Sequence, residues 1–264
     1  MRIIAGPCQH ESIGKSGEIA EHCKQICDKY GVEYYFKASF DKANRTSIDG
    51  ERGLGLYPTN HAFIDLKHEI SGLKILTDVH TVDQIRSLAY QGSGHSVDVL
   101  QIPAFLCRQT DLIVEASKTE KIINIKKGQF MAPWDVKGIL SKTKRAEEVW
   151  ITERGTSFGY GRLVNDFTGM YDLLADLGDR FVYDITHSVQ TPGSQGTSTG
   201  GNRDYVPHLA RAGAALGISS FFIEVHADPD SAPSDGPNML KLSDFDNVVE
   251  NIMEFSYAQH RNNN

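Results

Sequence analysis

The chain has 264 residues, 40% of them hydrophobic and 23% charged, which is enough for one large globular domain or two small ones. Its formal net charge of −7 and pI of about 5.8 argue against a general nucleic-acid binder, and no apolar run approaches the roughly 20 residues that span a membrane. Four cysteines without a CxxC pair, and an N-terminus without the hydrophobic stretch of a signal peptide, predict a reduced, cytoplasmic protein.

Short apolar segments alternate with longer segments of helical pattern along the chain. Stretches such as 19–30 and 166–178 have apolar residues at helical spacing. Strands that alternate with such helices form parallel β-α units, and eight units in this length favour an α/β fold of the (β/α)8 TIM-barrel type. With no linker or change of composition, residues 1–264 are predicted to form a single domain. The predicted strands are 2–7, 32–39, 73–79, 97–103, 121–127, 148–155, 181–188 and 220–227.

Every predicted strand ends on polar or ionisable residues. In barrels of this kind the active site forms at the carboxyl ends of the strands, so we predict a polar cavity there. The residues at these ends are, in chain order, Cys8, Lys37, Ser39, Asp78, His80, Gln101, Lys126, Lys127, Glu153, Arg154, Asp184, His187, Glu224 and His226.

Cations are concentrated at this end although the chain is acidic. The segment FKASFDKANRTS (36–47) carries Lys37, Lys42 and Arg45, and Lys126 and Arg154 each end another strand. Guanidinium and ammonium groups bind phosphate and carboxylate, so the pattern indicates a ligand with more than one anionic group. Taken singly, Lys127 and Arg203 are better explained as solvated surface residues.

A second group offers sulfur, nitrogen and oxygen donors, which together suit Zn²⁺, Fe²⁺, Co²⁺ or Mn²⁺. Its members are Cys8, His187, Glu224 and Asp235. They meet only if the barrel closes and places its first strand beside its eighth. Considered alone, Cys8 is more simply a small buried apolar residue. The segment 191–201, rich in Gly, Ser and Thr, is predicted to be a lid over the barrel mouth.

With these motifs assembled, the chain resembles the 3-deoxy-D-manno-octulosonate 8-phosphate (KDO-8-phosphate) synthase family nearly from end to end. The related 3-deoxyheptulosonate 7-phosphate (DAHP) synthases usually carry Lys-Pro-Arg-Thr where this chain reads KANRTS, so Ala43 and Asn44 separate the two possibilities. The motifs that carry the resemblance are AGPCQHES, FKASFDKANRTS, LTDVH, DVLQIPAFLCRQTDL, NIKKGQFMAPWD, TERGTSFGYGRLVND, YDITHSVQTPG and IEVHADPDSAPSDGPN.

The resemblance implies that phosphoenolpyruvate, D-arabinose 5-phosphate and water yield the eight-carbon sugar acid phosphate and inorganic phosphate, for lipopolysaccharide biosynthesis. The implied phosphoenolpyruvate pocket consists of Lys42, Lys126 and Arg154, with Ser39, Gln101 and His187 nearby. Lys37 and Asn44 would meet the aldose, and Arg45 and Thr46 would hold its phosphate at the mouth of a neighbouring subunit's site. Asp78 and Gln190 complete the expected substrate-binding residues, and His187 and Asp235 the catalytic ones.

The same family contains metal-dependent members with cysteine at the position of Cys8 and metal-independent members with asparagine there. The resemblance therefore implies a divalent metal (Zn, Fe, Mn or Co) held by Cys8, His187, Glu224 and Asp235. It also implies a homotetramer. Some members plug the bottom of the barrel with an N-terminal hairpin; here we expect the helix at 245–259 to cover that end, or the end to stay open.

Three alternatives stay open on the sequence alone. The first is a DAHP synthase, which would use erythrose 4-phosphate. The second is a non-catalytic barrel that binds phosphosugars as a sensor. The third is an aldolase that forms a Schiff base through Lys126, because this lysine ends a strand.

Overall fold

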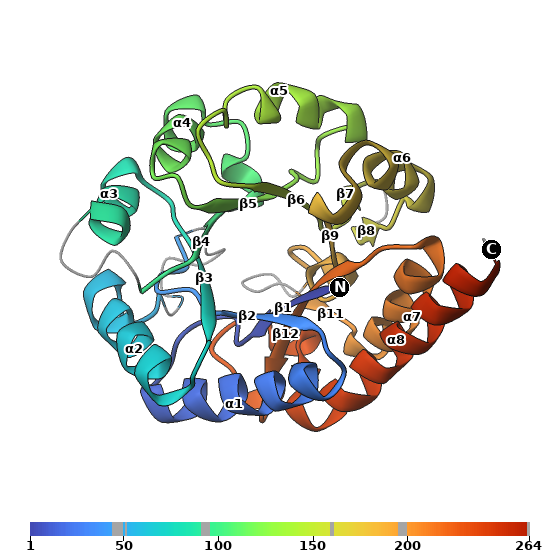
Figure 1. Ribbon diagram of the computed structural model, residues 1–264, viewed down its shortest axis with the longest axis horizontal. Helices are drawn as coiled ribbons and strands as arrows, with labels where there is room; N and C mark the ends of the chain where they lie inside the picture. The colour runs from blue at the N-terminus through green and yellow to red at the C-terminus, as the bar shows by residue number, and fades with distance from the viewer. Residues whose placement is uncertain (44–49, 51, 91–95, 159–160, 195–199, 263–264) are drawn as a thin grey trace.

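A closed ring of eight parallel strands forms the centre of the molecule (Figure 1). The computed structural model describes residues 1–43, 50, 52–90, 96–158, 161–194 and 200–262. Neighbouring strands pair in chain order, and the last pairs with the first, so the TIM-barrel prediction is confirmed. The strands are β1 (Arg2–Gly6), β2 (Glu33–Lys37), β3 (Lys74–Asp78), β4 (Val99–Ile102), β5 (Ile122–Lys126), β6 (Val149–Glu153), β9 (Phe181–Asp184) and β12 (Ser220–His226).

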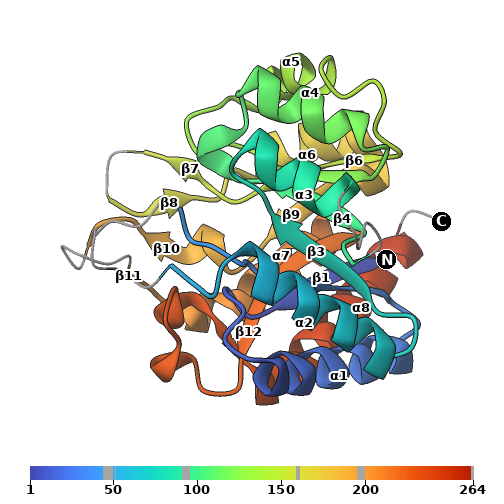
Figure 2. The same ribbon diagram turned by 90° about the vertical axis from the view of Figure 1, so that its left-hand side faces the viewer.

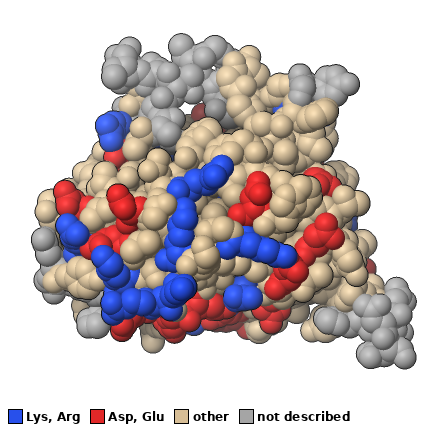
Figure 3. Space-filling model, turned by 90° about the horizontal axis from the view of Figure 1, so that it is seen from above, with Lys and Arg blue, Asp and Glu red and all other residues tan. Residues whose placement is uncertain are grey.

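In the part of the chain that the structure describes, eight helices surround this barrel (Figure 1). The helix α8 packs beside α7 and α1 in the outer ring, so the expectation that the segment 245–259 covers the barrel bottom was wrong. On the flank seen in Figure 3, basic and acidic side chains lie interspersed. No helix in the described part of the chain is long and apolar enough to cross a bilayer. The helices are α1 (Ile13–Lys29), α2 (Leu56–Glu69), α3 (Val82–Tyr90), α4 (Thr110–Lys118), α5 (Val136–Leu140), α6 (Phe167–Leu177), α7 (Val206–Leu216) and α8 (Phe245–Asn262).

Two short antiparallel strand pairs lie at one end of the barrel. The antiparallel pairs β7 (Thr156–Ser157) with β8 (Leu163–Val164), and β10 (Gln190–Thr191) with β11 (Gly200–Gly201), lie at the end away from the N-terminus (Figure 2). The two-residue strand β13 (Leu240–Lys241) pairs with the end of β12. Single 3₁₀ turns occur at η1 (Ala104–Leu106), η2 (Pro133–Asp135), η3 (Gly178–Arg180), η4 (His187–Val189), η5 (Arg203–Tyr205), η6 (Pro229–Ser231), η7 (Gly236–Asn238) and η8 (Leu242–Asp244).

The inside of the barrel is an apolar layer between two polar layers. The apolar layer is a cluster separate from the core that joins the strands to the helices. Because side chains alternate along a strand, the residue two positions further on points the same way, and at the carboxyl end that residue is mostly polar. The buried members of the apolar layer are Ile4, Tyr35, Leu76, Val99, Trp150, Val182 and Phe222. The residues two positions beyond them are Gly6, Lys37, Asp78, Gln101, Thr152, Asp184 and Glu224.

Candidate active site at the carboxyl ends of the strands

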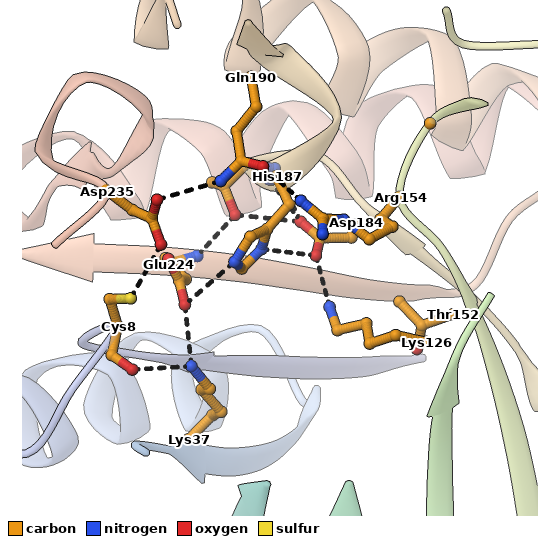
Figure 4. Close-up of polar contacts among 12 residues, drawn as sticks. Cys8, Lys37, Lys126, Thr152, Arg154, Asp184, His187, Gln190, Glu224 and Asp235 are labelled. Carbon is orange, nitrogen blue, oxygen red and sulfur yellow. Dashed lines mark hydrogen bonds and ion pairs between the residues drawn. The ribbon is translucent and has the colours of Figure 1, made fainter. Parts of the chain in front are cut away.

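Two buried ion pairs lie at the carboxyl end of the barrel, and each joins two strands that have one strand between them (Figure 4). Lys37 Nζ lies 2.8 Å from Glu224 Oε1 and donates to the carbonyl of Cys8 at 2.9 Å. Only 2% of the Lys37 side chain and 1% of the Glu224 side chain are exposed. Lys126 Nζ donates to Asp184 Oδ2 from the other side of the cavity. Burying charges is costly unless they are paired, so these pairs have to form together with the fold.

Lys126 has an unusual environment for a cation. Burial lowers the pKa of Lys126 to about 8, although the Asp184 carboxylate opposes this shift. Its Nζ also lies 3.2 Å from the centre of the Phe222 ring. At neutral pH this ammonium is therefore charged but held in apolar surroundings, where its attraction for an anion is stronger than in water.

His187 joins the two ion pairs. Its Nδ1 lies 2.7 Å from Asp184 Oδ2, and its Nε2 lies 3.5 Å from Glu224 Oε1. Asp184 Oδ1 accepts the backbone N–H groups of Thr186 at 3.1 Å and of His187 at 2.8 Å, which fixes the turn after β9. Burial favours the neutral carboxyl of Asp184, but the charges of His187 and Lys126 hold its pKa well below the ordinary value.

A group of three possible metal ligands lies within the described residues: Cys8, Glu224 and Asp235. Their ligand atoms all lie within 4.8 Å of one another. The pairing of β1 with β12 places Gly6 opposite Glu224, which explains how residues from the two ends of the chain meet. The thiol of Cys8 donates to Asp235 Oδ2 at 3.1 Å. Burial and the neighbouring Glu224 raise the pKa of Cys8 above its ordinary value. His187, predicted as the fourth ligand, adjoins this group through Glu224.

Arg154 reaches the same cavity from the end of β6. Its Nη2 donates to Gln190 Oε1, and Gln190 Nε2 donates to Asp235 Oδ1 at 3.1 Å (Figure 4). Arg154 Nε is buried and has no hydrogen-bond partner within the described residues. An unpaired guanidinium donor inside a polar cavity indicates that an anionic ligand belongs there.

The first part of the segment 36–47 lines another side of the cavity. Lys42 Nζ donates to Ser39 Oγ at 2.8 Å, and Ser39 Oγ donates to Asp78 Oδ1. Asp78 Oδ2 lies 3.3 Å from His80 Nε2. Burial alone would lower the pKa of Lys42, but its electrostatic interactions with Cys8 and Asp78 raise it instead. The predicted substrate residues Asn44, Arg45 and Thr46 lie outside the described residues.

Two buried side chains of this layer, Asn124 and Thr152, were not predicted from the sequence. Asn124 Nδ2 donates to Gln101 Oε1 at 3.0 Å, so the amide of Gln101 is engaged and oriented before any ligand binds. Asn124 is fully buried, as is its other partner Thr152. An asparagine in the middle of the apolar run IINI, just before Lys126, was a signal that could have identified Asn124.

Two interpretations of cations as solvated surface residues were wrong. Lys127 is fully buried, with Nζ 3.1 Å from Glu153 Oε2 and bonded to the carbonyl of Met131 at 2.9 Å. Because side chains alternate along β5, Lys127 points away from the cavity that holds Lys126. Arg203 donates to the carbonyl of Gly236 at 2.8 Å and to Asp230, so it holds a loop in place.

Comparison with known proteins finds similarity over nearly the whole chain. Residues 1–259 match the model of the DAHP synthetase I family. A 2-dehydro-3-deoxyphosphooctonate aldolase of Bartonella henselae is 51% identical over 261 residues, which cover 98% of this chain and 91% of the relative. Proteins of the same name from Bartonella quintana (49% identical, 99% and 92% covered) and Brucella anthropi (50% identical, 96% and 90% covered) are also similar.

Proposed function

The chain belongs to the DAHP synthetase I family, and on that basis we propose that it condenses phosphoenolpyruvate with D-arabinose 5-phosphate and water. The products are 3-deoxy-D-manno-octulosonate 8-phosphate, a precursor in lipopolysaccharide biosynthesis, and inorganic phosphate. The relatives that match at about half identity over nearly the whole chain carry the name of this activity. The observation that carries the proposal is the buried group of cations at the barrel mouth, with an unpaired donor on Arg154.

Phosphoenolpyruvate carries a carboxylate and a phosphate, and we assign these anionic groups to Lys126, Arg154 and Lys42. Lys126 and the Nε atom of Arg154 are buried. Lys42 Nζ donates to Ser39 Oγ beside them, in surroundings where charges attract anions more strongly than in water. Lys37, Ser39, Asp78 and Gln101 line the remaining wall and are assigned to the aldose and its surroundings. Asn44 keeps its predicted role at the aldose, and Arg45 and Thr46 keep theirs at its phosphate.

The reaction requires a new carbon–carbon bond and the loss of phosphate. The π electrons between C2 and C3 of the enol form the bond from C3 to the aldehyde carbon. The aldehyde oxygen takes up a proton, and water adds at C2 and loses one. The C2–O bond to phosphate then breaks, and inorganic phosphate leaves as the hydroxyl at C2 loses its proton and becomes the keto group. Lys126 and Arg154 stabilise the anionic groups throughout, because they are already oriented in a site of low dielectric. Asp184 holds the imidazole of His187 at Nδ1, which directs Nε2 toward Glu224 and the cavity.

We also propose that Cys8, Glu224, Asp235 and His187 hold a divalent metal (Zn, Fe, Mn or Co). The thiol and carboxylate atoms lie close enough to share one ion, and their chemistry suits these metals. The Asp184 carboxylate behind His187 is the usual partner of a metal-bound histidine. When bound, such an ion supplies Lewis-acid chemistry, either at the aldehyde or at a water molecule.

Four large aromatic side chains support the proposal of a homotetramer. They are exposed on the loops that follow β4, β5 and β6, with 72% of Phe158 and 67% of Trp134 accessible. Aromatic side chains are enriched at interfaces between subunits. Sedimentation analysis should give a mass four times that of the chain. The other two side chains are Phe105 and Phe130.

A phosphate-release assay tests the proposed activity directly. Purified protein is supplied with phosphoenolpyruvate and either arabinose 5-phosphate or erythrose 4-phosphate, with and without a chelator. We expect release with the five-carbon sugar and its loss in chelator. Faster release with the four-carbon sugar would favour the DAHP synthase, and no release with either would favour a sensor. Borohydride should trap no adduct on Lys126, because the enol supplies the nucleophile.

A further inference from the structure

Gln190 was expected to bind substrate, but its side chain contacts two other residues of the site. The amide oxygen accepts from Arg154 Nη2, and the amide nitrogen donates to Asp235 Oδ1 at 3.1 Å (Figure 4). The side chain is buried, with 7% of the residue exposed. We propose that Gln190 is a positioning residue with two partners. It orients Arg154, which is proposed to bind phosphoenolpyruvate, and at the same time Asp235, which is proposed to bind the metal. This inference rests on the function proposed above.

The chemistry of the amide suits this position. Arg154 can only donate hydrogen bonds, and an ionised Asp235 can only accept them. A residue that joins the two needs an acceptor and a donor at the end of one side chain, which glutamine has. A glutamate would set a second carboxylate against Asp235, and a lysine would set a second cation against Arg154.

The contact also decides which oxygen of Asp235 is available. Gln190 Nε2 occupies Oδ1, whereas Oδ2 faces the thiol of Cys8 at 3.1 Å. Asp235 adopts a left-handed backbone conformation, with φ of 56°, which is uncommon for a residue with a side chain. Such a backbone has to be held by its surroundings, and the bond from Gln190 is one such restraint.

The short hairpin of β10 and β11 holds the Asp235 loop at further points. Gln190 pairs with Gly201 in this hairpin. Gly201 packs so closely against Asn238 that a Cβ at position 201 would overlap the amide oxygen of Asn238. Arg203, just after β11, donates to the carbonyl of Gly236 at 2.8 Å. Both strands of the hairpin therefore restrain the loop that carries Asp235, and among the described residues of the hairpin only Gln190 also bonds to Arg154.

Two hydrogen bonds restrain Arg154, and the other donors of its guanidinium remain for an anionic ligand. The backbone N–H of Arg154 donates to Glu153 Oε1 at 2.8 Å, and one terminal nitrogen of its guanidinium donates to Gln190. Arg154 Nε has no partner within the described residues. Removing the amide at position 190 should free the guanidinium to adopt other rotamers and weaken its grip on an anion.

The test compares Gln190→Met, which keeps the length of the side chain, with Arg203→Met, which removes only a restraint on the loop. Two dissociation constants are measured without turnover. Phosphoenolpyruvate is titrated calorimetrically in the presence of chelator, and Co²⁺ is titrated into chelator-free protein by its thiolate absorption band. Thermal midpoints of both variants show whether a change in affinity merely reflects lost stability.

For Gln190→Met we expect both dissociation constants to rise, that of Co²⁺ by about 10- to 100-fold, as for other residues that orient metal ligands. For Arg203→Met only the Co²⁺ constant should rise. If Gln190→Met leaves either constant within twofold of the wild type, or if Arg203→Met weakens phosphoenolpyruvate equally, the inference is wrong. Wild-type protein that binds Co²⁺ and phosphoenolpyruvate but releases no phosphate would instead overturn the proposed function alone. Wild-type protein that binds neither would overturn both.

Discussion

The two ends of the barrel carry similar residues in different surroundings. At the amino end, Arg2 pairs with Glu33 at 3.3 Å and with Glu148 at 3.8 Å, and Lys74 pairs with Glu33 at 2.6 Å. The guanidinium of Arg2 stacks over Trp150, 4.0 Å from its ring centre, so this layer closes the barrel bottom. Here 46% of the Lys74 side chain and 38% of the Glu33 side chain are exposed to solvent.

At the carboxyl end the same classes of side chain are almost fully buried. Lys37 pairs with Glu224 and Lys126 with Asp184, and none of the four side chains is more than 5% exposed. The pKa of Lys126 falls to about 8 here, whereas the exposed Lys74, next to Glu33, has a raised pKa. The two ends carry the same residue types. The candidate active site at the carboxyl end therefore differs from the structural layer at the amino end in how completely water is excluded from its charges.

The largest expected effect comes from removing one partner of a buried ion pair, which tests whether burial distinguishes the two ends of the barrel. Lys37→Met leaves Glu224 buried without its cation, and we expect the free energy of unfolding to fall by about 3–5 kcal/mol, with loss of turnover. Urea denaturation in the presence of chelator measures this change. The double variant Lys37→Met, Glu224→Gln should recover part of the stability but none of the activity. A single variant as stable as wild type would show that burial at this end is not costly.

Removing a donor from the proposed metal site should have the next largest effect. Cys8→Ala takes away the sulfur that lies between Glu224 and Asp235, so we expect metal affinity to fall by at least about 100-fold, more than for an outer residue. Metal content after gel filtration, together with phosphate release, checks this expectation. Full activity of this variant in chelator would refute the metal proposal.

The low pKa of Lys126 predicts a pH dependence. The ammonium loses its proton as pH rises through about 8, so kcat/KM for phosphoenolpyruvate should fall about tenfold per pH unit above that value. Lys126→Arg stays charged, and in this variant the decline should disappear, whatever its absolute rate. A wild-type profile that is flat to pH 9.5 would contradict the assignment.

The contribution of Lys126 to the free energy of unfolding should rise over the pH range in which kcat/KM falls. The ordinary lysine pKa is 10.5, so between about pH 8 and 10.5 the unfolded chain binds more protons at this position than the folded one. The cost of a buried charge at Lys126 is present below pH 8 and is relieved as pH rises. The contribution of Lys126 to folding stability therefore increases where its contribution to activity decreases.

Most of the architecture could be predicted, because parallel strands buried on both faces appear as short apolar runs at regular spacing. All eight strand predictions contain an observed strand. The ends of those strands also identified Cys8, Lys126 and Glu224 as neighbours in one cavity. Barrel closure is what makes this possible, since it converts positions far apart in sequence into a ring.

Side-chain direction and loop contacts were harder to predict. Lys126 and Lys127 are adjacent in the sequence, and only the register of β5 decides that Lys126 faces the inside of the barrel while Lys127 is buried on the opposite side of the strand, beside Glu153. The bond between Gln190 and Asp235 joins two loops 45 positions apart, for which no periodicity exists. The role of Gln190 was therefore expected at the substrate, whereas the structure places its amide between two protein side chains.

The smallest expected effect belongs to the amino end and completes the comparison. Lys74→Met makes at that end the same replacement as Lys37→Met makes at the other, and Lys74 also has a carboxylate partner, Glu33. Because both side chains of this pair are well exposed, we expect a change of less than about 1 kcal/mol in the free energy of unfolding and unchanged kcat/KM. The effect should shrink further in high salt, which screens exposed charges. If Lys74→Met instead costs as much as Lys37→Met in the same urea titration, then burial does not distinguish the two ends, and the chemistry at the carboxyl end needs another physical cause.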